Sequence, residues 1–318
     1  MISFIIIGRN EGWRLTKCLT SIHLVINEDK ITDYEIIFVD SKSTDDSIER
    51  AKSFKVVQVY KITGECNAAI ARNIGALEAK GDVLFFIDGD MEIQKGFLPL
   101  VMDVTLNHLT YPFVSGIYED YIYTENWEFL EVRRRYNLSE GMSDIYEPVT
   151  GGLFIINKEL WNLLGGMDTR LVRSQDLDFG LMLANKGVLL LTKSYLLAYH
   201  HTIDYFNIKR KSNHAKYALY SALLARKHYF DLNYQKLFIR TQYTVIGLVI
   251  SLVFTILFSP LFLLFYIILV LIKTYKANLK SNLNFLDLFR ILMSRDFVFI
   301  FAFLSYYPKY KKLKYTKL

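Results

Sequence analysis

The sequence predicts an α/β protein whose mostly parallel sheet is flanked by helices and followed by a helical, membrane-associated region. Short apolar runs alternate with amphipathic stretches over residues 1–100, which favours parallel strands joined by right-handed helical crossovers. Charged residues are absent from Tyr243 to Ile272, a stretch long enough to span or enter a bilayer. We therefore expect an α/β domain over residues 1–235 and a membrane-associated region over residues 236–318.

The expected elements follow from apolar periodicity and capping residues. Strands are expected at residues 3–7, 34–39, 56–60, 83–87, 115–123, 151–156 and 188–191. Helices are expected after Asn10, after Thr44, and over residues 68–80, 126–138, 158–164 and 177–186.

Asp88-Gly89-Asp90 is the most informative motif of the chain. It follows Val83–Ile87, an unbroken apolar run that is typical of a strand buried on both faces of a parallel sheet. Ligands of open α/β sheets bind at the carboxyl ends of the strands. Two carboxylates separated by one residue can share a hard divalent cation, whose remaining oxygen ligands come from phosphates. The alternative is an ordinary surface turn, because Asp and Gly are both turn residues.

The net charge of +6 is distributed in a way that argues against nucleic acid. Basic residues flank the apolar stretch, with Arg226, Lys236 and Arg240 before it and Lys273 and Lys276 after it, and more lysines follow near residue 311. Such cations favour the anionic cytoplasmic leaflet, so membrane lipids are an expected partner. Two cysteines and an N-terminal strand in place of a signal peptide favour the reducing cytosol.

Five segments in order resemble the family 2 glycosyltransferases, membrane-associated bacterial-type sugar transferases with the GT-A fold. The segments are SFIIIGRNE, IIFVDSKSTDDS, AIARNIGALEAKGDVLFFIDGDMEI, GGLFIINKELWNLLGGMDTRLVRSQDLDFGLMLANKG and AYHHT, which together span residues 2–202. The resemblance implies a nucleotide-sugar donor, a glycan or lipid-linked acceptor, and a divalent metal, Mn²⁺ or Mg²⁺.

The resemblance also implies residue roles on the donor side. The nucleotide-sugar is expected to contact Asn10 and Glu11 in the first turn, Asp40 at the second strand end, and Arg72 and Asp88. The metal is expected at Asp88 and Asp90. His200, or alternatively His201, would add a ligand or a phosphate contact, and an imidazole suits Mn²⁺ better than Mg²⁺. The alternative for the histidines is a structural role at a strand end.

On the acceptor side, Asp176 is expected to be the catalytic base of an inverting transfer, which takes the proton of the attacking hydroxyl. Asp178 is its competitor and an expected acceptor contact, and Gly151 and Gly152 would allow close backbone approach to the acceptor. Gln175 stands where the family usually has an acid. It is the one observation that favours a non-catalytic glycan-binding or scaffold protein.

These features together predict inverting, metal-dependent sugar transfer in the synthesis of a cell-surface polysaccharide. A polyprenyl-phosphate sugar synthase is the alternative enzyme, although such synthases usually lack the segment around Asp176. The catalytic domain would lie on the cytoplasmic side of the cytoplasmic membrane. Ser259-Pro260 interrupts the apolar stretch, so residues 243–272 form either one kinked helix or a re-entrant hairpin. Residues 297–307 predict an interfacial helix.

Overall fold

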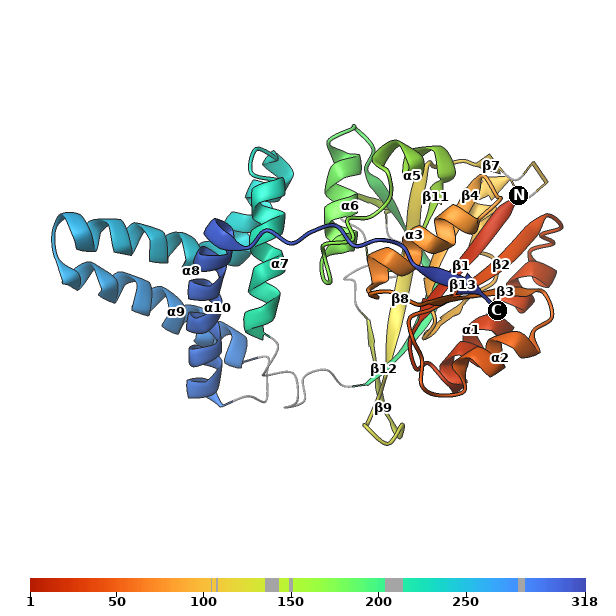
Figure 1. The fold of residues 1–318 in the computed structure, drawn as a ribbon, viewed down its shortest axis with the longest axis horizontal. Helices are drawn as coiled ribbons and strands as arrows, with labels where there is room; N and C mark the ends of the chain where they lie inside the picture. The colour runs from red at the N-terminus through yellow and green to blue at the C-terminus, as the bar shows by residue number, and fades with distance from the viewer. Residues whose placement is uncertain (104, 107, 135–142, 149–150, 204–213, 280–283) are drawn as a thin grey trace. The chain divides into compact units, whose positions relative to one another are not determined.

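The computed structural model describes residues 1–103, 105–106, 108–134, 143–148, 151–203, 214–279 and 284–318. These residues form two compact units (Figure 1). The first unit comprises Met1–Asp204 and Tyr310–Leu318, and the second comprises Tyr205–Lys309. In sequence, the second unit is therefore an insertion within the first. Helix α7 (His214–Lys227) precedes the expected boundary at residue 235 and belongs to the second unit.

The centre of the first unit is the predicted parallel sheet. Strands β1 (Ile2–Gly8), β2 (Tyr34–Asp40), β3 (Val57–Ile62) and β4 (Val83–Asp88) lie in the order β4-β1-β2-β3 and are all parallel. The predicted α/β fold class is confirmed. Because the strands are parallel, the carboxyl ends of β1, β2 and β4 lie at one edge, where polar loops follow.

Antiparallel pairings extend the sheet beyond β4. Strand β11 (Phe154–Asn157) is antiparallel to β4 and to β8 (Phe113–Tyr123), and β8 is parallel to β12 (Leu190–Ile203). Strands β5 (Met91–Ile93) and β10 (Ile145–Glu147) both pair with β12. A separate small sheet joins β6 (Met102–Asp103) and β7 (His108–Leu109). The pairing of β5 with β12 brings His200 beside Asp90.

Helices cover both faces of this sheet (Figure 1). They are α1 (Trp13–Glu28), α2 (Ser47–Ser53), α3 (Ala68–Glu78), α4 (Leu98–Val101), α5 (Lys158–Leu164) and α6 (Gln175–Ala184). Side chains of β1 alternate between two apolar cores, with Phe4 and Ile6 packed on the α1 side and Ile5 and Ile7 on the α3 side. Helix α3 packs closely, since a Cβ on Gly75 would lie 2.2 Å from Ile5 Cγ2.

The helix expected over residues 126–138 is wrong for its described part. Residues Phe129–Arg134 form strand β9, which pairs antiparallel with β8, and residues 135–138 lie outside the described residues. Apolar and charged residues alternate with a period of two from residue 130 to residue 133, which is the strand period. Opposite charges face each other across the pair at Asp120 and Arg133. The run Arg133-Arg134-Arg135 follows directly and interrupts the alternation, so the strand period is short in the sequence.

The second unit is helical. Its helices are α7, α8 (Leu232–Leu257), α9 (Leu263–Asn278) and α10 (Phe285–Ser305), with a short 3₁₀ turn at Pro260–Phe262. Helix α8 ends at Leu257, and Ser259 caps the turn that begins at Pro260, so residues 243–272 form two packed helices and not one kinked helix. The expected interfacial segment, residues 297–307, is mostly the second half of the longer helix α10.

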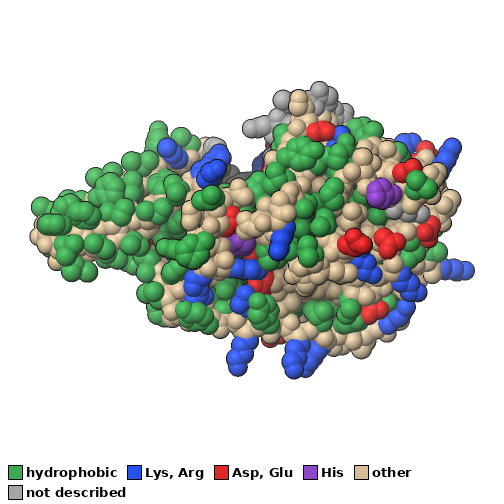
Figure 2. All heavy atoms as spheres, turned by 90° about the horizontal axis from the view of Figure 1, so that it is seen from above, with side chains coloured by type: hydrophobic (Ala, Val, Ile, Leu, Met, Phe, Trp, Pro, Cys, Tyr) green, Lys and Arg blue, Asp and Glu red, His purple; other side chains and the backbone are tan. Residues whose placement is uncertain are grey.

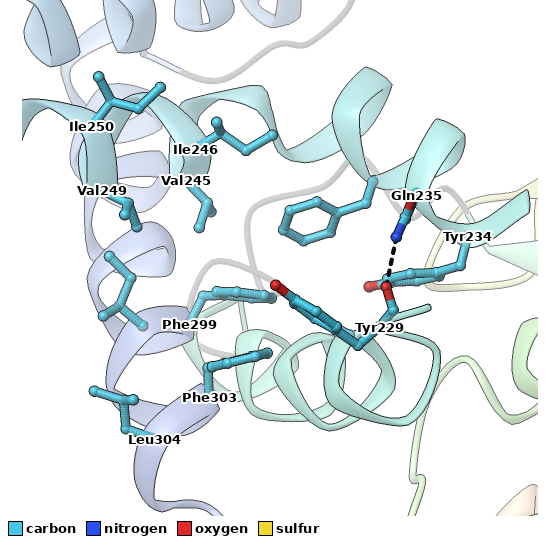
Figure 3. Close-up of a pocket in the computed structure, with 13 residues that line it drawn as sticks. Tyr229, Tyr234, Gln235, Val245, Ile246, Val249, Ile250, Phe299, Phe303 and Leu304 are labelled. Carbon is cyan, nitrogen blue, oxygen red and sulfur yellow. Dashed lines mark hydrogen bonds between the residues drawn. The ribbon is translucent and has the colours of Figure 1, made fainter. Parts of the chain in front are cut away.

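Two stretches of this unit, Leu232–Leu257 and Pro260–Asn278, are long and apolar enough to cross a membrane by length and composition. Hydrophobic side chains are exposed along both of them, including Phe254, Ile256 and Phe265 (Figure 2). An apolar cavity of about 600 Å³ lies among α7, α8 and α10 (Figure 3). Its lining includes Phe238, Phe299 and Phe303, and its polar atoms come from Tyr229, Tyr234 and Gln235.

Candidate functional site

The candidate site lies where β1, β2 and β4 end. Gly8 pairs with Asp40, and Ile7 pairs with Asp88, so three loops begin at the same level of the sheet. The Ser41 N–H donates to the Gly8 carbonyl at 2.9 Å, and the Gly89 N–H donates to the Ile7 carbonyl at 2.8 Å. Parallel register thus brings the expected donor-side residues together, although they are far apart in the sequence.

Asn10 joins the loop after β1 to the loop after β2 by hydrogen bonds. Its backbone N–H donates to Ser43 Oγ at 2.9 Å, and its Oδ1 accepts from the Thr44 N–H at 2.8 Å. Asn10 has φ of 58°, a left-handed conformation that asparagine tolerates better than most residues. Asn10 therefore shapes the loops, and its contact with a nucleotide stays a prediction.

Asp40 is fully buried. Both of its carboxylate oxygens accept from the Ser43 N–H, at 3.2 and 3.0 Å. The carboxylate thus stabilises the turn after β2 in this structure. The expected contact between Asp40 and a base stays a prediction.

The Glu11 side chain lies against the backbone at the ends of β1 and β4. A Cβ on Gly8 would lie 2.7 Å from Glu11 Cγ, and one on Gly89 would lie 3.0 Å from it, so glycines leave room for this side chain. Burial, reinforced by the negative charge of Asp90, raises the pKa of Glu11 to about 7. Glu11 can therefore exchange a proton near neutral pH.

Arg14 joins the donor-side carboxylates and was not predicted. Its Nη2 lies 2.7 Å from Glu11 Oε2, and its Nη1 lies 3.5 Å from Asp90 Oδ2 and donates to the His201 carbonyl at 3.3 Å. The guanidinium also lies 4.4 Å from the centre of the Trp127 ring. In the sequence, Arg14 falls in the first turn of an amphipathic helix, where its charge resembles any solvated helix charge. Its spacing of three residues from Glu11 was the one available signal.

Asp88 is held by a buried cation. Arg72 Nη2 donates to Asp88 Oδ1 at 2.6 Å and to the Gly152 carbonyl at 3.3 Å. Burial raises the pKa of Asp88 against the opposing charge of Arg72, and the charge of Asp176 adds to the increase. A Cβ on Gly152 would lie 2.3 Å from Asp88 Oδ2, so this position accepts only glycine without displacement. Gly152 therefore contacts the donor-side carboxylate, in addition to its expected acceptor role.

Asp90 faces His200, and the expected metal-ligand role of this pair stays a prediction. His200 Nε2 lies 3.3 Å from Asp90 Oδ2, and His200 Nδ1 lies 2.7 Å from Asp120 Oδ1. Burial by itself would lower the pKa of His200, but hydrogen bonds to Asp120 and Asp90 raise it to about 10. Burial by itself would raise the pKa of Asp90, but His200 and Arg14 bring it below its usual range. Asp120, which orients His200 from β8, was also missed.

His201 occupies a different environment. Its Nε2 lies 2.9 Å from Glu92 Oε2, and its Nδ1 lies 2.9 Å from the hydroxyl of Tyr123. Both ring nitrogens are therefore engaged by partners other than Asp90. Of the two histidines, His200 has the geometry expected of the metal-site residue.

The donor set at this edge fits a divalent cation in part. Asp90 Oδ1 is buried without a hydrogen-bond partner, and Asp88 and His200 lie beside it with oxygen and nitrogen donors. Among the described residues, no group of three or more His, Cys, Asp and Glu side chains is arranged to hold a metal ion. A cation here would need further ligands from a bound substrate.

Helix α6 carries the expected acceptor-side residues. Asp176 and Asp178 lie in its first turn, where negative charge suits the helix dipole. Asp176 is partly exposed, and its charge acts on Asp88. Asp178 is fully buried and sits near Arg170. Gln175 Oε1 is buried without a hydrogen-bond partner. Of the two aspartates, Asp176 is the accessible one.

The profile of the family described as Glycosyl transferase family 2 matches residues 3–160. This range includes Asp40, Arg72, Asp88 and Asp90. The chain therefore carries a glycosyl transferase family 2 domain. Helix α6, with Asp176, lies beyond the matched residues.

Curated relatives of the family 2 domain include animal sugar transferases. The chain is 28% identical over 199 residues to polypeptide N-acetylgalactosaminyltransferase 6 from Bos taurus, covering 53% of this chain and 32% of that protein. It is 31% identical over 155 residues to polypeptide N-acetylgalactosaminyltransferase 8 from Drosophila melanogaster, covering 42% of this chain and 26% of that protein. The chain thus spans about a third or less of these relatives.

Among solved structures, the chain is similar to residues 1–349 of TarS from S. aureus in complex with UDP-GlcNAc. The TM-score is 0.53 at 16% identity, and the match covers 70% of this chain and 65% of that one. A second crystal structure of TarS residues 1–349 matches with a TM-score of 0.52. At this identity the likeness shows the fold, which is the GT-A type.

Proposed function

We propose that this protein transfers a sugar from a nucleotide-sugar donor to a glycan or lipid-linked acceptor, with inversion at the anomeric carbon. One observation carries the proposal: at the end of β4, the Asp88 carboxylate is held by Arg72 and the Asp90 carboxylate faces His200. The solved complex of TarS with UDP-GlcNAc supports a UDP-linked donor.

Asp88, Asp90 and His200 would hold a divalent cation, Mn²⁺ or Mg²⁺, with the donor diphosphate. The cation supplies Lewis-acid stabilisation of the charge that develops on the leaving diphosphate. Arg72 orients Asp88, while Asp120 orients His200 from its other ring nitrogen. For His200 to act as a ligand through Nε2, its ring proton would lie on Nδ1, where Asp120 Oδ1 at 2.7 Å accepts it in a hydrogen bond.

Asp176 is proposed as the base. The acceptor hydroxyl attacks the anomeric carbon from the face opposite the diphosphate, and its proton moves to a carboxylate oxygen of Asp176. The Leu177 N–H donates to Asp176 Oδ1 at 2.8 Å, which fixes the carboxylate at the start of α6. The buried Asp178 is proposed to stabilise the first turn of α6.

The donor proposal is tested by calorimetric titration of UDP-, GDP- and dTDP-sugars into the detergent-purified full chain, with Mn²⁺ or with a chelator. We expect one nucleotide to bind only with metal, and we expect this binding to be lost in Asp90→Asn. Lys95→Gln, at an exposed lysine that pairs with Glu28 and follows Asp90 by five residues, serves as the control. If no nucleotide binds with metal present, the scaffold alternative that Gln175 favours replaces this proposal.

The base is tested by comparing Asp176→Asn with Asp178→Asn. Removal of a general base costs about 10²- to 10⁴-fold in rate, so Asp176→Asn should lose transfer by that factor while donor affinity persists. NMR of the first product reports whether the anomeric configuration inverts. Full turnover in Asp176→Asn together with loss in Asp178→Asn would refute the assignment.

We also propose that residues 236–318 include the membrane-associated region and that the catalytic domain faces the cytoplasm. The exposed apolar side chains of α8 and α9, and the cationic residues that flank them, support this proposal. Flotation of the purified chain with anionic vesicles tests it. Failure to float, with the chain folded and monodisperse without detergent, would contradict it.

A further inference from the structure

The chain segment that leads into α6 is held on one side by α3. Asn73 pairs with the backbone of Met167 in both directions, through Nδ2 to the carbonyl and through Oδ1 to the N–H, each at 2.8 Å. Asn67 Nδ2 donates to the Thr169 carbonyl at 2.9 Å. Because α3 also carries Arg72, one helix supports both Asp88 and the segment before Asp176.

On its other side the same segment contacts residues from the end of the sequence. Thr169 Oγ1 accepts from the Lys311 N–H at 2.9 Å and donates to the Lys311 carbonyl at 3.1 Å. Thr169 is only 7% exposed, so both bonds are shielded from water. Next to it, Arg170 pairs with Asp168 at 2.7 Å and lies 4.1 Å from the centre of the Tyr310 ring.

We call residues Tyr310–Leu318 the returning segment, because they rejoin the first unit after the second. Strand β13 (Tyr315–Lys317) pairs antiparallel with β3 and adds an edge strand to the main sheet. The Lys314 carbonyl accepts from the Thr63 N–H at 2.8 Å, and the Tyr315 hydroxyl bonds to Glu78 on α3. Through these contacts the returning segment packs as an integral part of the first unit.

We propose that the returning segment positions Asp176, with Thr169 and Lys311 as positioning residues of the glycosyl transfer site. The proposal rests on the proposed function and deepens it. Only three residues separate Leu171, which is fully buried, from the start of α6 at Gln175. A shift at Thr169 therefore reaches Asp176 with little chain to absorb it. The donor-side carboxylates are held by Arg72, Arg14 and His200, three side chains that lie outside the segment from Met167 to Gln175.

The test uses Thr169→Val in the detergent-purified full chain. Valine keeps the side-chain shape but removes the hydroxyl, so the Lys311 N–H and carbonyl lose their partner. A displacement of about 1 Å can cost about 10²-fold in rate, so we expect kcat for transfer to fall 10- to 100-fold with donor Kd unchanged within twofold. Thr169→Ser should restore kcat. Glu65→Gln, which removes only the exposed ion pair to the Lys311 side chain, is the matched control.

Hydrogen exchange provides a readout that does not need activity. In Thr169→Val, amide exchange should become faster over residues 168–184 and remain unchanged over the β4 end. Equal loss of donor affinity and kcat, or failure of Thr169→Ser to restore kcat, would overturn the proposal in favour of a general folding role. Unchanged exchange over α6 would also overturn it. If the unmodified chain transfers no sugar while α6 exchange responds as expected, the proposed function fails and the positioning contact stands.

Discussion

The guanidinium of Arg72 donates a hydrogen bond to Oδ1 of Asp88 at 2.6 Å, from a side chain that is 3% exposed to one that is 33% exposed. One end of this pair lies in the core and the other faces the site. The core therefore fixes the orientation of a carboxylate that a ligand can still reach, which is the preorganisation a charged substrate requires.

Replacing Arg72 with methionine should remove this hold on Asp88. Hydrogen bonds to charged groups contribute about 1.5–3 kcal/mol, and the partial exposure of Asp88 reduces this, so we expect the free energy of unfolding to fall by about 1–2 kcal/mol. Urea unfolding with an unchanged m-value measures it. Arg50→Met, at an exposed pair with Asp46, should show no measurable change. An unaltered midpoint in Arg72→Met would mean that other contacts hold Asp88.

Gly152 and Gly151 form a matched pair for the donor site. A Cβ on Gly152 would lie 2.3 Å from Asp88 Oδ2 and 2.7 Å from Arg72 Nη2, so Gly152→Ala should displace the carboxylate. A Cβ on Gly151 would meet nothing closer than the Tyr118 hydroxyl at 3.8 Å. Calorimetry should show a donor Kd at least about tenfold weaker in Gly152→Ala, or about 1.4 kcal/mol, and an unchanged Kd in Gly151→Ala. Equal Kd values would contradict this geometry.

Arg14 should contribute to stability because it is a buried cation between two carboxylates. In Arg14→Met, the Glu11 and Asp90 carboxyl groups would lose the guanidinium that lies between them. Breaking such a buried arrangement costs about 3–5 kcal/mol, so we expect a loss of about 3 kcal/mol in metal-free protein, measured by chemical unfolding. Lys17→Met, one turn further on an exposed face, should stay within about 0.5 kcal/mol. A comparable loss in both variants would show that Arg14 has no special role.

Gly247 allows α8 and α9 to approach. A Cβ there would lie 2.3 Å from Leu269 Cδ1, so Gly247→Ile should force the helices apart. Overpacking of this kind costs about 1–3 kcal/mol, which a lower thermal midpoint in detergent would report. Val253→Ile, at an exposed position of α8, is the control. Donor Kd should not change in either variant, because the donor-side residues belong to the first unit.

Much of the donor side could be predicted because its residues follow apolar strands. Asp40 and Asp88 end such strands, and parallel register alone requires their loops to meet. Arg14 and Asp120 could not be predicted in this way. Each lies inside a regular element, and its role depends on which neighbour the fold places opposite its side chain.

The basic residues after position 308 illustrate the same limit. In the sequence they resemble a cationic tail beside a membrane segment. In the structure, Lys311 contacts Thr169 through its backbone, and Lys317 lies in an edge strand beside β3. Hydrogen bonds that use the Lys311 backbone to reach a residue about 140 positions away have no compositional signature, because every non-proline residue carries the same backbone donor and acceptor.

The sequence by itself determined the α/β class, the motif at the end of β4 and the apolar character of α8 and α9, because burial and strand or helix period act on neighbouring residues. Only the tertiary structure decided that Arg72 and Arg14 hold the carboxylates, that His200 and not His201 faces Asp90, and that the returning segment braces Thr169. These outcomes depend on strand register and on contacts between distant segments, which arise only when the whole sheet assembles.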